Sequence, residues 1–151
     1  MIDRDLVETI VGSNEIGTRG SGLDSTQNLS VSPAECTVQD KTRSQTVIQV
    51  SVGKVDDVEE WESKLRSEQR DATYGTCHTY DGDPGYGYGC VYDSGTWISG
   101  AGVNVIRSEQ LLRVVVHHWD KTSAKQRMKL AEDITRNVDH NVNRAKAGAD
   151  Q

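Results

Sequence analysis

The sequence predicts an α+β fold in which helices pack on an antiparallel β-sheet of five or six strands. Three observations favour this class. Apolar residues recur at helical spacing near both ends and in the middle of the chain, β-branched runs lie between these segments, and short polar turns join the runs. Of the 151 residues, 34% are hydrophobic, so we expect a single domain over residues 1–151, because two separate cores would each lack apolar side chains.

The first predicted element is a short N-terminal helix over residues 3–11. Gly12 follows it, at the place where a helix usually ends. Residues 12–34 are rich in Gly, Ser, Asn and Thr and show neither a helical nor a strand period, so we expect a long loop there. The apolar residues that recur at helical spacing in the first segment are Ile2, Leu6, Val7, Ile10 and Val11.

A β-hairpin and an acidic helix are expected next. Residues 35–41 and 46–55 flank a polar turn, and the second run is β-branched, as strands prefer. Asp56 or Asp57 then caps a middle helix that runs to about Glu68. The apolar stripe of this helix consists of Val58, Trp61 and Leu65.

The second half of the chain predicts more strands and a long C-terminal helix. The helix begins after Thr122 or Ser123 and carries small and apolar residues at helical spacing over about five turns. The tail, residues 145–151, is small and polar, so we expect it to fray. The predicted strands are Thr76–Tyr80, Gly89–Tyr92, Thr96–Ile106 and Leu111–Trp119.

The charge of the chain limits its partners. A net charge of −6 argues against nucleic acid, because proteins that follow phosphates need an excess of Lys and Arg. Residues 56–71 are mainly acidic and residues 121–146 mainly basic, which predicts solvated outer helix faces or, as the alternative, a basic docking face on the last helix. No run of about 18 apolar residues predicts a transmembrane segment, and charges within residues 1–15 predict no signal peptide in this sequence.

The three cysteines allow at most one intramolecular disulfide. We expect it between Cys77 and Cys90, because they lie in two short β-like runs around a Gly/Pro/Asp loop, and a hairpin would bring them opposite each other. Cys36 is left over. A disulfide favours an oxidising compartment; the alternative is two reduced, half-buried thiols in a cytoplasmic protein.

All five tyrosines lie in one Gly-rich segment, residues 74–92. Tyr offers a rigid contact surface with a polar tip, and Gly lets a loop adapt to a ligand, so this hairpin is the predicted ligand-binding site. The alternative is that Tyr serves as an ordinary cross-strand residue and Gly serves tight turns. The predicted ligand-binding residues are Tyr80, Tyr86, Tyr88, Tyr92, Asp81 and Asp83.

Catalytic and metal signatures are weak. Asp81, Asp83 and Asp93 lack the ligand order of a calcium loop, and His117 and His118 would face opposite sides of a sheet. A zinc site that joins His78 to one of them is the alternative. No nucleotide, nucleophile or metalloprotease motif is present, so we predict no catalytic residues, no metal site and no cofactor; in an enzyme, His78 and Cys36 would be the first candidates.

The order of the predicted elements resembles that of small actinobacterial cell-envelope lipoproteins of unknown function and related extracellular sensor domains. The matching features are an N-terminal helix, a Gly/Ser-rich loop that ends in Pro33–Cys36, a hairpin, an acidic helix, and the strand around Gly89-Cys90-Val91. A strand with Ser99-Gly100-Ala101-Gly102, a Val-rich strand and a closing helix follow. The resemblance implies export and binding, with any membrane tether outside this sequence. The lipobox cysteine and signal peptide of such proteins are missing here, and Cys36 has no partner.

These observations lead to three functional hypotheses. The first is a non-enzymatic secreted or cell-envelope domain that binds a protein, glycan or small ligand through the hairpin at residues 74–92. The second is a cytoplasmic interaction or regulatory domain that docks through the basic C-terminal helix. The third is a small hydrolase or metal enzyme.

Overall fold

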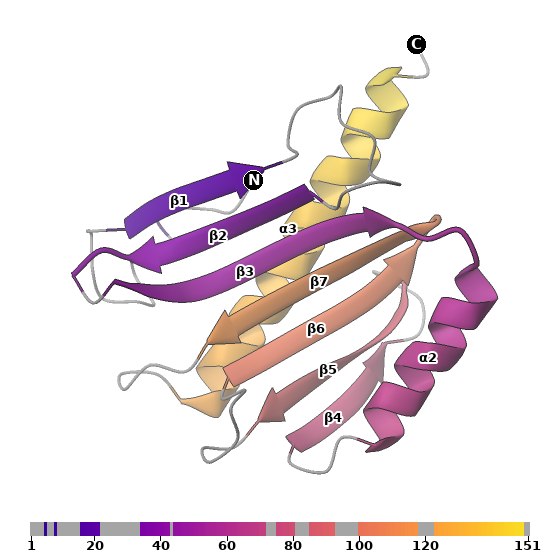
Figure 1. Cartoon of the computed structure of the whole chain (residues 1–151), viewed down its shortest axis with the longest axis horizontal. Coiled ribbons are helices and arrows are strands. Elements are labelled where there is room, and N and C mark those ends of the chain that lie inside the picture. The colour runs from indigo at the N-terminus through magenta and orange to yellow at the C-terminus, as the bar shows by residue number, and fades with distance from the viewer. Residues whose placement is uncertain are drawn as a thin grey trace.

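One antiparallel β-sheet organises the computed structural model of this chain (Figure 1). The structure describes Asp5, Glu8 and residues 16–21, 34–42, 44–71, 75–80, 85–92, 100–117 and 123–149. In this part of the chain, seven strands lie in the order β1-β2-β3-β7-β6-β5-β4, with two helices, α2 (Val58–Asp71) and α3 (Ala124–Ala149). The strands are β1 (Ile16–Ser21), β2 (Ala34–Asp40), β3 (Gln45–Lys54), β4 (Gly75–Tyr80), β5 (Tyr86–Tyr92), β6 (Gly100–Arg107) and β7 (Gln110–His117).

The α+β class is confirmed, but the predicted count of five or six strands is wrong. The additional strand is β1, which lies inside the segment 12–34 that we expected to be a loop. Its sequence, IGTRGS, contains one large apolar residue, so no alternation of apolar and polar residues marks it. It forms because its backbone pairs with β2 along its whole length, from Ile16↔Asp40 to Ser21↔Glu35.

The helices differ from prediction mainly at their ends. Most of the predicted helix at 3–11 lies outside the described residues; the two described residues of this segment, Asp5 and Glu8, are helical. Helix α2 extends beyond Glu68 to Asp71, and α3 remains helical to Ala149, into the tail that we expected to fray. None of the helices formed by the described residues has the length and apolar character needed to cross a membrane.

The caps of both helices agree with the sequence. The Asp57 carboxylate accepts a hydrogen bond from the backbone N–H of Glu60 at 2.9 Å, which identifies Asp57 as the N-cap of α2. At α3, Ser123 and Gln126 form a reciprocal capping box: the N–H of Gln126 donates to Ser123 Oγ, and the N–H of Ser123 donates to Gln126 Oε1.

The larger core lies between α3 and one face of the sheet; α3 contacts β5, β6 and β7, and it runs behind the strands in Figure 1. Alternate residues of the central strands point toward it, as the two-residue period of a strand requires. Leu130 and Ala131 of α3 are fully buried there. The strand residues that they meet include Ile48, Val50, Val103, Val105, Val114 and Val116.

Among the described elements, α2 covers part of the opposite face of the sheet. Helix α2 contacts β5 and β6, where Leu65 packs with Tyr88, Cys90 and Ile106 in a second, smaller core cluster. On the same face, the side chains that β2, β3 and β7 present beside α2 remain half-buried or exposed. We call this surface the open face; its members are Glu35, Thr37, Gln49, Ser51, Arg113 and Val115.

Candidate functional site

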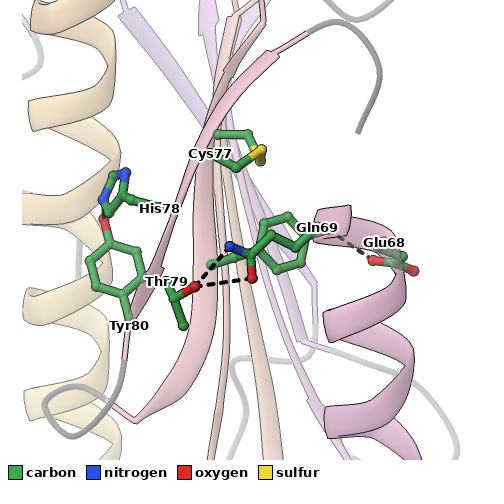
Figure 2. Close-up of a disulfide and its surroundings, with 8 residues drawn as sticks. Glu68, Gln69, Cys77, His78, Thr79 and Tyr80 are labelled. Atoms are coloured by element: carbon green, nitrogen blue, oxygen red, sulfur yellow. Dashed lines mark hydrogen bonds between the residues drawn. A yellow bond between two sulfur atoms is a disulfide. The ribbon is translucent and has the colours of Figure 1, made fainter. Parts of the chain in front are cut away.

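The predicted disulfide is present at the β4 edge of the sheet. Cys77 and Cys90 are directly opposite each other in β4 and β5, with a Cα–Cα distance of 4.1 Å and a bond between their sulfur atoms (Figure 2). Cys90 is fully buried beneath α2. The remaining cysteine, Cys36, is a free, half-buried thiol in β2, and burial raises its pKa.

The tyrosines of the predicted binding hairpin do not form one surface. Tyr80 lies on the α3 side of β4, together with His78, whereas Thr79 and Cys77 face α2 (Figure 2). Tyr86 and Tyr88 pack in the cluster beneath α2. The alternation of side chains along a strand predicts this difference. Tyr80 lies an odd number of residues from Cys77 and therefore points to the opposite face, whereas Tyr88 lies an even number from Cys90 and points to the same face as Cys90.

Each described tyrosine side chain is engaged in packing. Tyr88 is 4% exposed, and its hydroxyl donates to the Glu68 carboxylate at 2.9 Å. The Tyr86 ring is half-buried, with the guanidinium carbon of Arg66 at 3.9 Å from its centroid. Tyr80 donates to the Glu132 carboxylate of α3. These ring positions favour the alternative to ligand binding, in which the tyrosines serve as cross-strand and core residues.

The hairpin glycines serve close packing. A Cβ atom added to Gly89 would collide with the end of Met128 in α3, and one added to Gly87 would collide with the backbone oxygen of Asn104 in β6. The side chain of Tyr92 and all of Asp81 and Asp83 lie outside the described residues. Ligand binding stays a prediction for these three residues and for Tyr80, Tyr86 and Tyr88.

A small polar cluster joins the edge strand β4 to α3. The Nε2 atom of His78 lies 2.7 Å from the Tyr80 hydroxyl and 3.1 Å from Glu132 Oε1. Burial, together with the hydrogen bond and negative charge of Glu132, raises the pKa of Tyr80 above its ordinary value. The phenol therefore stays protonated at neutral pH and acts as a hydrogen-bond donor to α3.

The histidines that the structure describes do not converge on a metal site. His78 lies on the α3 side of β4, whereas His117 in β7 contacts Gln49 on the open face, with its Nε2 at 3.1 Å from Gln49 Oε1. Within the described part of the chain, no three His, Cys, Asp or Glu side chains are grouped to hold a metal ion.

The basic docking face considered as the alternative for the C-terminal helix is interrupted by acidic side chains. Lys129 pairs with Asp133 at 2.7 Å, and Arg136 lies 3.7 Å from the same residue. Asp139 of α3 pairs with Arg107 of β6. Part of the positive charge between Ser123 and His140 is therefore balanced within the fold.

Sequence reasoning missed the open face, which contains a hollow of about 220 Å³. Two cross-strand rows form its floor: Glu35, Ser51 and Arg113 make one, and Thr37, Gln49 and Val115 make the other. Arg113 contributes a guanidinium to the hollow, and its Nε is buried and has no hydrogen-bond partner among the described residues. The available signal in the sequence was this one charged residue inside the apolar run Leu111–Val116.

The Arg113 guanidinium is positioned by its neighbours. Its carbon lies 5.9 Å from the centroid of the Trp61 ring on α2, at the border between the covered and open parts of the sheet. The Nζ atom of Lys64 lies 4.3 Å from the centroid of the same ring, so two cations lie near Trp61.

Comparisons with known protein families, with curated proteins and with solved structures found no match to this chain.

Proposed function

We propose that this chain is a non-enzymatic binding domain that works in the cell envelope or the extracellular space and contacts its ligand through the open face. The observation that carries the binding function is the hollow between β2, β3 and β7, lined by a guanidinium, a carboxylate, an amide and two hydroxyl groups. Such a set of donors and acceptors fixes the orientation of a ligand in many binding sites.

The disulfide supports the location. Cys77 and Cys90 form a disulfide. Disulfides persist in oxidising compartments and are rare in the reducing cytoplasm. This agrees with the export implied by the resemblance to actinobacterial envelope lipoproteins and extracellular sensor domains. We place the contact surface on the open face and not on the hairpin, because Tyr80, Tyr86 and Tyr88 are occupied in packing against the two helices.

The location is tested by peptide mapping of unreduced, alkylated protein. The chain is produced once through an export route and once in a reducing cytoplasm. We expect a Cys77–Cys90 peptide pair and one alkylated thiol, at Cys36, in the exported protein. Three alkylated thiols in both preparations would contradict the export and favour a cytoplasmic protein.

The binding surface is tested by amide NMR of the isotope-labelled chain against pools of small carboxylates, amines, sugars and short peptides. Binding at the proposed surface shifts the amides of Gln49, Ser51, Arg113 and Val115. Arg113→Gln should abolish these shifts, whereas Arg66→Gln, which removes another arginine that contacts an aromatic ring, should leave them unchanged. Shifts confined to the hairpin or to α3 would refute the open face as the binding surface.

A further inference from the structure

The hollow on the open face carries opposite charges on its two sides. Glu35 of β2 is in register with Ser51 of β3, and Ser51 is in register with Arg113 of β7. Two inter-strand spacings therefore separate the Cα atoms of the two charged residues, which is about 10 Å. Neither Glu35 nor Arg113 forms an ion pair with any described residue, although both side chains line the same hollow.

Arg113 is suited to a carboxylate. Its planar guanidinium offers several N–H donors in a fork that matches the two oxygens of a carboxylate. A buried donor without an acceptor is costly, and the Nε of Arg113 is such a group within the described structure. Because this Nε is buried, a ligand carboxylate in the hollow would bind through the terminal N–H groups of the guanidinium.

Glu35 restricts which of the anions that Arg113 could bind would be accepted in the hollow. Its carboxylate lines the same hollow and is exposed, so it would repel a dianion such as inorganic phosphate and attract an ammonium group. The row between the two charges contains the Ser51 hydroxyl, and the adjacent row contains Thr37 and Gln49. These neutral groups provide hydrogen bonds to the middle of a polar ligand.

We infer that the hollow binds a small amphoteric molecule that carries a primary ammonium and a carboxylate, that is, a free amino acid or a short peptide with free ends. Arg113 holds the carboxylate and Glu35 holds the ammonium. The volume of about 220 Å³ favours a ligand of this size, because pockets for drug-sized molecules usually measure about 300–1,000 Å³. This inference rests on the proposed binding function and gives it a ligand class.

The test is an amide NMR titration with alanyl-alanine and two blocked forms of it. The N-acetyl form lacks the ammonium and the C-terminal amide lacks the carboxylate. We expect alanyl-alanine to shift the amides of Gln49, Ser51 and Arg113, and each blocked form to bind at least about tenfold more weakly, which corresponds to about 1.4 kcal/mol.

Two variants assign each charge to its partner. Arg113→Gln should weaken alanyl-alanine binding about tenfold, and in this variant blocking the carboxylate should have no further effect. Glu35→Gln should likewise remove the effect of acetylating the ammonium. Arg66→Gln, outside the hollow, is the control that should bind like the parent protein, and thermal melting of each variant checks that it is folded.

Three results would overturn the inference. They are the absence of shifts at about 20 mM alanyl-alanine, well above a millimolar Kd, equal binding of the blocked and free forms, and equal binding of inorganic phosphate. If another class of molecule shifts the same amides, the proposed binding function stands and only the amphoteric ligand is rejected. Shifts that lie wholly outside the open face would reject both.

Discussion

The disulfide should supply a large share of the stability of this fold. The perturbation is selective reduction of the Cys77–Cys90 bond in the otherwise unchanged protein. The two cysteines are separated by 13 positions. In the chain-entropy description, closing a loop of this length costs the unfolded chain about 10 cal/mol/K, so the bond stabilises the folded state by about 3 kcal/mol at 25 °C.

The assay compares urea unfolding of oxidised and reduced protein at neutral pH, followed by circular dichroism. A loss of about 3 kcal/mol corresponds to a fall in Tm of about 6–12 °C for a chain of this size. Cys77→Ala/Cys90→Ala is a second perturbation, which should lose somewhat more, because Cys90 is fully buried and alanine leaves its neighbours under-packed. Cys36→Ala is the control, since it has no part in the bond and should show the same difference between oxidised and reduced forms.

One result would refute this reasoning. If oxidised and reduced protein unfold within about 0.5 kcal/mol of each other, the bond does not act by restricting the unfolded chain as the entropy argument requires. Peptide mapping before each measurement shows that the oxidised sample contains the bond. A large difference in the urea slope would instead show that reduction changes the compactness of the unfolded state.

Three further predictions concern single side chains. Tyr88→Phe removes a hydrogen bond to Glu68 and should lower the free energy of unfolding by about 1 kcal/mol. Tyr86→Phe removes a buried hydroxyl without a described partner and should be neutral or stabilising. Equal losses of the two variants in urea unfolding would contradict this contrast. Burial lowers the pKa of His117, so below about pH 6.5 the unfolded chain binds more protons than the folded one, and stability should fall as the pH decreases from about 7.5 to 5. His117→Gln should flatten this dependence; an unchanged slope would reject His117 as its source. Because burial raises the pKa of Cys36, iodoacetamide should alkylate it more slowly in folded than in urea-unfolded protein at about pH 8, and equal rates would argue against its burial.

Local patterns in the sequence predicted most of the regular structure. The predicted strand runs at 35–41, 46–55, Thr96–Ile106 and Leu111–Trp119 became β2, β3, β6 and β7, and the apolar stripe with its capping residue became α2. These signals work because strand and helix periods depend on neighbouring residues alone. The disulfide also followed from local geometry, since a hairpin brings Cys77 and Cys90 into direct register.

The sequence alone could not show where the elements meet. Strand β1 has little apolar pattern and is held by its pairing with β2, which is a contact between segments separated in the chain. The assignment of Tyr80, Tyr86 and Tyr88 to packing also depended on which helix covers which face of the sheet.

Composition, strand and helix periods and the Cys77–Cys90 pairing were thus determined by the sequence itself, because each depends on residue type or on short separations along the chain. The open face was decided by the tertiary structure. Arg113 on β7 lies far in the sequence from Glu35 and Ser51 on the β2–β3 hairpin, and the order β2-β3-β7 brings the three residues into one row. Of the two described helices, α2 packs over β5 and β6 and not over these three strands, because Leu65 is buried against Tyr88, Cys90 and Ile106.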